Sequence, residues 1–238
     1  MSSTAYSRTF VSALPAGALS FLLGGCAVQP REGQLLYADD FWNLDNWHVE
    51  AEKPANVRAA QAVLDIDAPA GITLWFKPRL EGPVEIEFEA TAVAAGGAND
   101  QVSDLNVFWM ATNNDKSEPV YARTRSGTFA EYGDLVTYYV GLGGNRNTTS
   151  RFRRYVGDPG NRPLLPQHDL SDPTAMLVPN KRLTITLIAD RRRIEFRRDA
   201  QPMFILDDAA PYTSGWFALR TTWSHLQIRT LRIRRPVE

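Results

Sequence analysis

Cysteine is almost absent from this chain of 238 residues, since Cys26 is its only one. No intrachain disulfide can form, so the fold depends on packing and hydrogen bonds. Histidine is also scarce, with three in total, and the spacing of His, Asp and Glu shows no catalytic metal motif. The apolar run at 10–23 is shorter than the roughly 20 residues that a membrane-spanning helix needs. We therefore expect neither a disulfide framework nor a spanning helix from this run.

The first 26 residues have the order of an export signal. Arg8 precedes the apolar run, which is followed directly by Leu23-Gly-Gly-Cys26. This order indicates a secretory signal, and its end resembles the lipobox of bacterial lipoproteins. The resemblance implies cleavage before Cys26, lipidation of its thiol, and a tether over 26–36 that precedes a single domain at 37–238. The alternatives are an ordinary signal peptide with an incidental cysteine, or a membrane anchor.

Net charge is also small, at −1, but the two halves of the chain differ. Residues 1–119 hold 7 Lys or Arg against 16 Asp or Glu, and residues 120–238 hold 19 against 11. Arginine supplies 22 of the 26 cations, which favours recognition of carboxylates or other anions by the guanidinium fork. A GC-rich genome would produce the same bias without any function. We expect no nucleic-acid partner for a protein anchored by lipid in the bacterial cell envelope, in the periplasm or on the outer-membrane surface.

Helical periodicity is nearly absent after residue 26, apart from one helical turn expected at 129–133. Apolar and polar residues alternate instead, as they do in strands with one buried face. This pattern predicts strands at 71–77, 84–90, 104–110, 135–141, 183–188, 193–197 and 215–220. Glycine, proline and asparagine separate them, which favours an all-β antiparallel sandwich or jelly roll. Beyond residue 225, the apolar positions change parity near Arg229-Thr230, which predicts a β-bulge there.

The stretch 137–155 carries the strongest functional signal. Two strand-like runs flank a Gly/Asn turn that includes Asn145, and the second run carries Arg151, Arg153 and Arg154. Tyrosine, asparagine and arginine together supply a stacking ring, hydrogen-bond donors and acceptors, and forks suited to anions. The stretch therefore predicts a surface for a polar, anionic ligand, and a solvated hairpin is the structural alternative.

A family resemblance rests on three segments. Leu36-Tyr-Ala-Asp-Asp-Phe-Trp with Leu44-Asp-Asn-Trp-His-Val49, the middle 71–76, and the closing 215–233 look like the first, early and last strands of concanavalin A-like jelly rolls. The chain is similar to uncharacterised bacterial proteins of polysaccharide-utilisation loci, and more distantly to laminarinases, jelly-roll polysaccharide lyases and 3-keto-disaccharide hydrolases. The resemblance implies a saccharide site on the concave sheet. It implies no cofactor, although a structural calcium often occurs in such folds.

The chain lacks the strand motif of laminarinase-like hydrolases. That motif, Glu-x-Asp-x-x-Glu, places nucleophile and acid/base on one face, as retaining cleavage requires. Residues 85–89 have glutamates at the wrong spacing, and residues 100–104 lack the terminal glutamate. We therefore do not expect the usual retaining mechanism.

β-Elimination from a uronic acid requires residue types that this chain has. A cation or amide neutralises the carboxylate, a Tyr or His removes the proton, and a Tyr protonates the leaving oxygen. Strand parity directs Tyr139 and Arg220 away from the core, and a turn at 221–224 is expected to bring His225 beside Arg220. We therefore predict Tyr139, Arg220 and His225 as catalytic residues of a polysaccharide lyase that acts on an acidic glycan.

Further residues are candidates for contact with the glycan. Each has a structural alternative, since aromatic side chains in a sandwich are more often core than platform. The candidates are Trp75, Trp109, Trp223, His48, Asn106, Asn145, Arg151 and Arg153. Two other functions stay open, namely a glycosidase with non-standard catalytic residues and a lipoprotein that binds oligosaccharides without cleaving them.

Overall fold

A computed structural model describes residues 33–237 together with Met1. Most of the described chain is strand, and its helices are single turns. The signal segment, Cys26 and most of the expected tether lie outside the described residues. Among the helices that are described, none combines the length and the apolar character needed to cross a bilayer.

The connections between the strands vary in length, and the longest runs from Thr112 to Val136. In chain order they are β1 (Gln34–Asp39), β2 (Trp47–Ala51), β3 (Asn56–Ala60), β4 (Val63–Phe76), β5 (Leu80–Glu81), β6 (Val84–Ala92), β7 (Leu105–Thr112), β8 (Val136–Gly143), β9 (Thr149–Val156), β10 (Asp169–Leu170), β11 (Arg182–Asp190), β12 (Arg193–Arg198), β13 (Gln201–Asp207) and β14 (Ser214–Arg235). The helical turns are α1 (Gly144–Asn147) and four 3-10 turns at Val120–Ala122, Phe129–Tyr132, Pro166–His168 and Pro173–Ala175.

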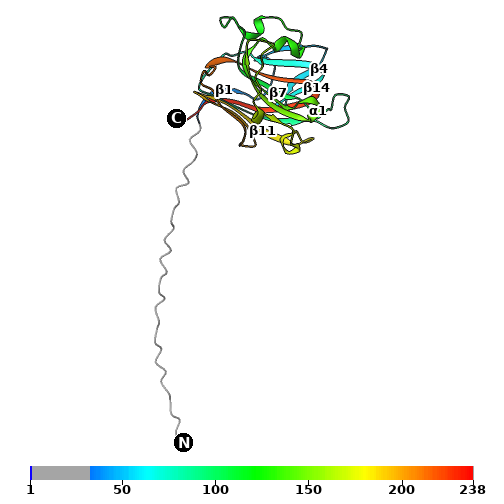
Figure 1. The fold of residues 1–238 in the computed structure, drawn as a ribbon. Coiled ribbons are helices and arrows are strands. Elements are labelled where there is room, and N and C mark those ends of the chain that lie inside the picture. The colour runs from blue at the N-terminus through cyan, green and yellow to red at the C-terminus, as the bar shows by residue number, and fades with distance from the viewer. Residues whose placement is uncertain (2–32, 238) are drawn as a thin grey trace. The chain divides into compact units, whose positions relative to one another are not determined.

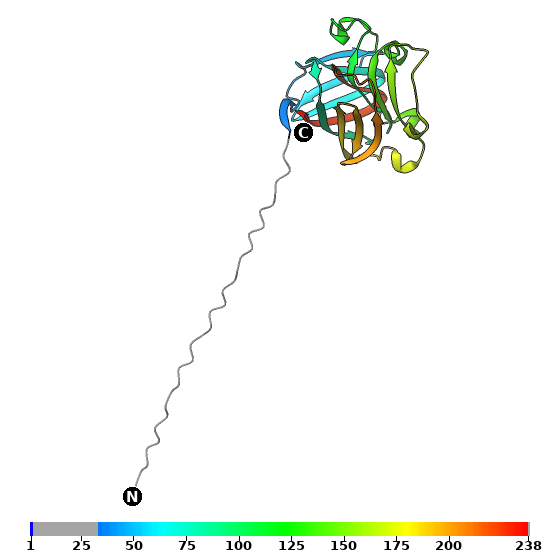
Figure 2. The same cartoon turned by 60° about the vertical axis from the view of Figure 1, so that its left-hand side comes forward.

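Two antiparallel layers face each other across the core. One layer contains β10, β9, β8 and β7, and the other contains β13, β12, β11 and β6. The long strands β4 and β14 pair with each other and belong to both layers, because the first half of β14 pairs with β7 and its second half with β6. Figures 1 and 2 show the resulting curled sandwich. The predicted all-β antiparallel sandwich is confirmed.

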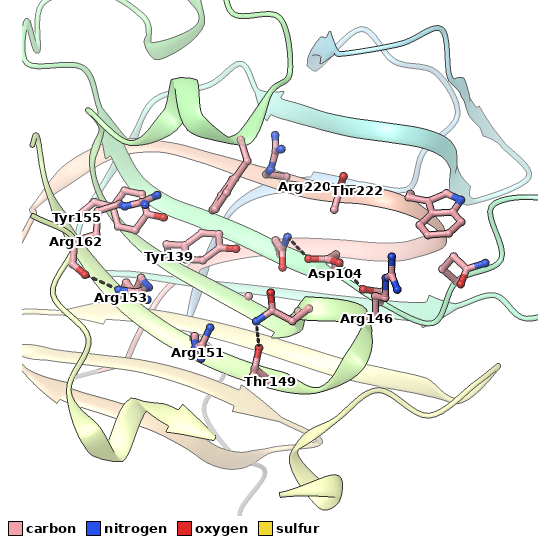
Figure 3. A pocket seen from close by; sticks show the side chains of 18 residues that line it. Asp104, Tyr139, Arg146, Thr149, Arg151, Arg153, Tyr155, Arg162, Arg220 and Thr222 are labelled. Atoms are coloured by element: carbon pink, nitrogen blue, oxygen red, sulfur yellow. Dashed lines mark hydrogen bonds between the residues drawn. The ribbon is translucent and has the colours of Figure 1, made fainter. Parts of the chain in front are cut away.

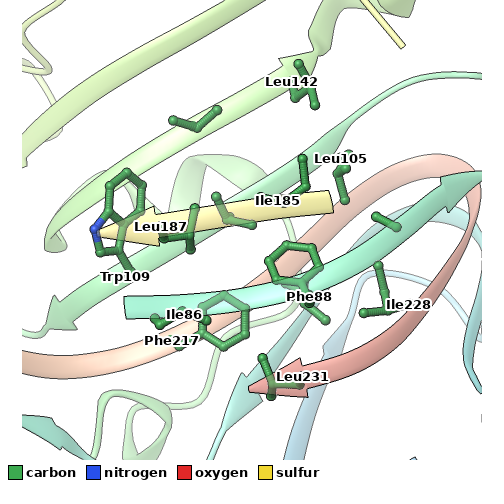
Figure 4. Packing of buried hydrophobic residues seen from close by; sticks show 14 of the residues in the cluster. Ile86, Phe88, Leu105, Trp109, Leu142, Ile185, Leu187, Phe217, Ile228 and Leu231 are labelled. Atoms are coloured by element: carbon green, nitrogen blue, oxygen red, sulfur yellow. The ribbon is translucent and has the colours of Figure 1, made fainter. Parts of the chain in front are cut away.

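Strand alternation builds the core between the layers. In β6 every second residue is buried, and Ile86 and Phe88 pack against Ile185 and Leu187 of β11 (Figure 4). Burial of a large apolar side chain contributes roughly 1.5–3 kcal/mol, which makes this the main source of stability in a chain whose single cysteine excludes disulfides.

A second, mostly aromatic cluster covers the opposite face of the first layer. It is built around Trp75, Phe108, Tyr139 and Trp216, from four different strands. The segment between β7 and β8 closes over it with Val120 and Tyr132. This cluster buries part of the outer sheet face, and the remaining part of that face is open.

The termini of the domain pair as expected for first and last jelly-roll strands, because β1 lies against β14 with Gln34 opposite Arg235. β1 begins inside the segment expected to be tether, so the fold starts earlier than predicted. The predicted bulge is present, since the β14–β6 register shifts between Arg229 and Arg232. The hairpin at 137–155 is also present as β8, α1 and β9.

One local prediction about β14 is wrong. Residues 221–224 form no turn, because β14 continues through them as one strand. The register with β4 shifts between Thr222 and Ser224, where Trp223 adopts a φ of 45°. This bulge changes the parity of the strand, so that Leu219 before it and Leu226 after it both face the core.

Candidate functional site

A cavity of about 460 Å³ opens on the outer face of the first layer. Its walls come from β7, β8, β9 and β14, and from the loops that precede β7 and join β8 to β9 (Figure 3). The volume lies in the range of about 300–1,000 Å³ that is usual for small-molecule sites. The cavity continues the face that carries the aromatic cluster, at the end which the 113–135 segment leaves open.

The floor of the cavity is polar and buried. Asn106 of β7 is 3 % exposed and Tyr139 of β8 is 7 % exposed, and they lie on neighbouring strands beside Gly141. The amide oxygen of Asn106 is buried and accepts no hydrogen bond. A buried acceptor without a partner is costly, so this oxygen marks a position where a ligand hydroxyl or amide would donate.

Tyr139 is held as a neutral phenol. Burial, followed by the nearby Tyr155 and Asp104, raises the pKa of its hydroxyl well above the ordinary value. Its ring packs on Phe108, with centroids 5.0 Å apart, which fixes its direction. At neutral pH this hydroxyl is therefore a hydrogen-bond donor or a proton donor, not a phenolate.

Arg220 of β14 is a buried cation at the edge of the floor. It is 2 % exposed, and its Nη1 donates to Thr73 Oγ1 at 2.7 Å and to the carbonyl of Gly127 at 2.9 Å. Its guanidinium also lies over the rings of Tyr132 and Phe129, at 4.8 and 5.0 Å. No carboxylate forms an ion pair with it among the described residues, so its charge is available to an anion in the cavity.

Asp104 is the one carboxylate among the described residues that line the cavity. It accepts hydrogen bonds from Ser103 and, at 3.3 Å, from Asn106 Nδ2. Burial nevertheless raises its pKa above the ordinary value for aspartate. A carboxylate in this state is a better base than a solvated one, because its proton affinity is higher.

Arginines form most of the charged wall. Five of them line the cavity against the single acid, namely Arg146, Arg151, Arg153, Arg162 and Arg220. Arg151 is partly neutralised by Asp169, 2.7 Å from its Nε, whereas Arg153 donates to the neutral carbonyl of Arg162, at 2.6 Å. The cavity is thus cationic, and it favours an anionic ligand.

Seven of the predicted site residues line this cavity: Tyr139, Arg220, Asn106, Asn145, Arg151, Arg153 and Trp223. Period-two alternation brings the members on β7, β8 and β9 to one face together with Arg220, because residues two apart on a strand point the same way. Trp223, three residues after Arg220, reaches this face only through the bulge in β14. Arg154 has the opposite parity and lies on the other side of β9, where it binds Asp208 at 2.7 Å.

Four predicted residues do not line the cavity. Trp109 is fully buried in the core between the layers, and Trp75 is fully buried in the aromatic cluster, where its Nε1 donates to Glu50. His48 stacks on Tyr121, at 5.1 Å between ring centroids. Neither tryptophan has an exposed ring face for a sugar, which corrects the prediction that they bind glycan.

His225 lies farther along β14 than the predicted turn would have placed it. Its Nδ1 is 2.9 Å from Asp100 Oδ1 and its Nε2 is 3.1 Å from Asp65 Oδ2. The imidazole therefore joins β14 to β4 and to the loop before β7, and it does not contact the cavity. The expectation that it lies beside Arg220 is corrected, because β14 does not reverse direction between them.

Several cavity residues were not predicted. Asp104 shares the strand parity of Asn106, so alternation alone signalled it. Arg146 comes from the turn α1, Phe129 from a 3-10 turn and Arg162 from a loop. No sequence period reveals the path of these connecting segments. No group of three or more His, Cys, Asp or Glu side chains within the described part of the chain is arranged to hold a metal ion.

Residues 66–231 match the model of a domain of unknown function, DUF6250. The chain belongs to the DUF6250 family. This match covers most of the described domain, from β4 to β14, and it includes every residue that lines the cavity. No curated protein matches the DUF6250 chain significantly.

Solved structures with the same fold are numerous. A protein of unknown function with a galectin-like fold from Bacillus subtilis has a TM-score of 0.67 at 16 % identity, over 87 % of the DUF6250 chain and 99 % of the other. A β-glucanase from Bacillus licheniformis gives 0.55 at 12 % identity, over 87 % and 100 %. The carbohydrate-binding module CBM66 from Bacillus subtilis gives 0.52 at 8 % identity, over 79 % and 95 %. At these identities the likeness establishes the fold, a jelly-roll sandwich of the concanavalin A and galectin type.

Proposed function

We propose that this DUF6250 chain is a carbohydrate-active protein that binds an acidic, uronate-bearing glycan in the arginine-lined cavity and cleaves it by β-elimination. The observation that carries the proposal is the cavity itself, where five arginines meet one aspartate beside a buried tyrosine. Solved structures of this fold include a β-glucanase and a carbohydrate-binding module, which supports a saccharide as ligand by analogy of fold.

Elimination would use the floor residues as follows. Arg220 pairs with the uronate carboxylate and so makes the proton on the adjacent carbon more acidic. Asp104, whose pKa is raised by burial, takes that proton as the carbon–oxygen bond of the leaving group breaks and a carbon–carbon double bond forms. Tyr139, held neutral by burial, donates its proton to the departing oxygen. These roles replace the predicted one of His225, which lies outside the cavity.

Hydrolysis is a weaker candidate for this cavity. A glycosidase that uses two carboxylates needs both beside the scissile bond, whereas the described residues lining this cavity include only Asp104 as an acid. Binding without cleavage is a better alternative to elimination than hydrolysis is. The described lining contains no histidine that could act as a base, and no carboxylate is hydrogen-bonded to Tyr139 to activate it.

The test is to incubate the protein with uronate-containing and neutral polysaccharides, while following the absorbance of unsaturated products and the appearance of reducing ends. Unsaturated product from an acidic glycan is expected. Tyr139→Phe and Asp104→Asn should each lower kcat by about two to four orders of magnitude with binding largely kept. Binding of several acidic glycans without any product would establish the binding alternative, and no binding of any acidic glycan would refute the proposal.

We also propose that the protein is exported and anchored by a lipid on Cys26, because the segment before Cys26 has the residue order of a secretory signal. The membrane would then be a partner only through the lipid. Cys26→Ser should yield unlipidated protein, either retained as precursor or released in soluble form. If the processed mutant still partitions with membranes, the anchor is elsewhere.

A further inference from the structure

The cavity has a buried floor and an exposed mouth, and the mouth carries its own pair of side chains. Trp223 lines the cavity yet is 44 % exposed, in contrast to the nearly buried Tyr139, Asn106 and Arg220. Arg146 lines the same side and is also exposed. Figure 3 shows the labelled Arg146 near Asp104, on the side away from Tyr155 and Arg162.

Trp223 is presented by a strained piece of backbone. Its φ of 45° lies in the left-handed region, which a bulky side chain rarely adopts. The strain sits in the β14 bulge, and without that bulge the ring would follow the regular alternation of the strand. Strained residues of this kind persist at functional sites because the surrounding structure holds them there.

Arg146 is presented in the same way from the other side. It is the middle of three consecutive left-handed residues, with Asn145 and Asn147, at φ values of 53°, 58° and 62°. Asparagine adopts this conformation readily but arginine does not. A regular turn would not need arginine there, so the residue type points to a role for its side chain.

The side chains of Arg146 and Trp223 lie beside each other at the mouth of the cavity. The guanidinium carbon of Arg146 is 6.0 Å from the centre of the Trp223 ring, the outer limit of a cation–π contact. No ion pair of Arg146 occurs within the described chain. The mouth therefore holds an exposed aromatic surface with an uncompensated cation at its edge.

Resting on the proposed function, we propose that Trp223 and Arg146 form an outer subsite for a second, negatively charged sugar residue of the same glycan chain. The indole stacks on the sugar ring, and the guanidinium pairs with its carboxylate. The floor takes one sugar residue and the mouth takes the next. The protein then selects acidic chains over acidic monosaccharides.

The experiment measures affinity against chain length. Galacturonate, digalacturonate and tetragalacturonate are titrated by calorimetry, in parallel with the corresponding oligomers of alginate, in which every sugar residue carries a carboxylate. For the series that binds, the tetramer should bind at least tenfold more tightly than the monomer. Trp223→Asn should lower the affinity for the tetramer about tenfold and leave the affinity for the monomer unchanged. Asparagine is chosen because it tolerates the same left-handed backbone.

Matched variants separate this role from a structural one. Trp223→Tyr, which keeps a ring, should retain most of the preference for long chains. Trp42→Ala changes another exposed tryptophan, 73 % exposed and outside the cavity, and should change no affinity. Arg146→Gln should lower the affinity for the acidic tetramer and make that affinity less dependent on salt. Arg79→Gln, which alters a similar cation–π pair with Trp216 outside the cavity, should not.

The outcomes distinguish the two proposals. If the monomer and tetramer bind equally, or if Trp223→Asn weakens both alike, the outer subsite is wrong while the floor site stands. If no acidic probe of any length binds, the proposed function fails, and the outer subsite with it. A tetramer preference that both Trp223→Asn and Arg146→Gln abolish supports the outer subsite.

Discussion

The hydroxyl of Tyr139 lies over Gly141, two residues along the same strand, so closely that a β-carbon on Gly141 would be 2.8 Å from it. The same β-carbon would lie 3.1 Å from the unpartnered amide oxygen of Asn106. The polar floor of the cavity therefore depends on a missing methyl group. Two potential ligand-binding atoms converge on the space that it leaves.

Gly141→Ala tests this dependence. The added methyl would push the Tyr139 ring or the Asn106 amide out of place, so binding of an acidic oligosaccharide should weaken by tenfold or more. Calorimetric titration measures the loss. Gly144→Ala is the matched control, because the nearest atom to its added carbon is 3.6 Å away. Equal losses in the two variants would contradict the special role of Gly141.

Arg153 and Arg154 are neighbours on β9 that face opposite ways, which makes them a matched pair. Arg153→Gln should lower the affinity for an acidic ligand and make that affinity less dependent on salt, because Arg153 lines the cavity. Arg154→Gln should leave binding intact but lower the free energy of unfolding by about 1–3 kcal/mol, because Asp208 loses the 2.7 Å hydrogen bond from Arg154 Nε. The reverse pattern in titration and urea unfolding would show that the cavity wall is assigned to the wrong arginine.

Tyr132 closes the aromatic cluster with a buried hydrogen bond. Its hydroxyl donates to Glu50 Oε2 at 2.6 Å, and the other oxygen of Glu50 has no partner. Tyr132→Phe should therefore lower the free energy of unfolding by about 1–3 kcal/mol, since the buried carboxylate loses a donor. Tyr37→Phe, at an exposed tyrosine, should change it by less than about 0.5 kcal/mol in the same urea titration.

His225 should make the stability of the fold depend on pH. Burial alone would lower the pKa of its imidazole, but the hydrogen bonds to Asp100 and Asp65, with the charges of Asp65 and Asp67, outweigh this and raise it. A raised pKa in the folded state means that the imidazolium stabilises the fold fully below the unfolded pKa of about 6.5. This contribution to the free energy of unfolding is lost as the pH rises through the pKa that His225 has in the folded state.

Urea unfolding between about pH 6 and pH 8.5 measures this loss. The wild-type free energy of unfolding should fall across this range, whereas His225→Gln should remove most of the fall. His48→Gln serves as control, because His48 stacks on the ring of Tyr121 and accepts or donates no hydrogen bond to a carboxylate within residues 33–237. A pH profile that His225→Gln leaves unchanged would exclude the imidazole as its source.

Strand alternation made much of the fold and part of the site predictable. Tyr139 and Arg220 face the cavity because their neighbours Val140 and Leu219 face the core, and a period of two needs no tertiary information. The same rule places Trp109 with Val107 in the core, so alternation alone argued against that glycan-binding candidate.

The rest depended on features without a sequence period. Trp75 shares the face of the cavity, but the segment between β7 and β8 covers it, and the path of a long loop follows from packing rather than from pattern. The bulge at Trp223 changes the parity of β14, but the strand continues through it. The residue types at 221–224 resemble those of a turn, and for this reason His225 was predicted beside Arg220.

The pairing of β14 sets an order for the assembly of the protein. Residues 214–235 pair with five other strands, β1, β4, β5, β6 and β7. Neither layer has its central strand until this segment has left the ribosome, and its contacts join distant parts of the chain, which slows folding. A nascent chain that lacks this segment therefore lacks the strand that joins β6 of one layer to β7 of the other.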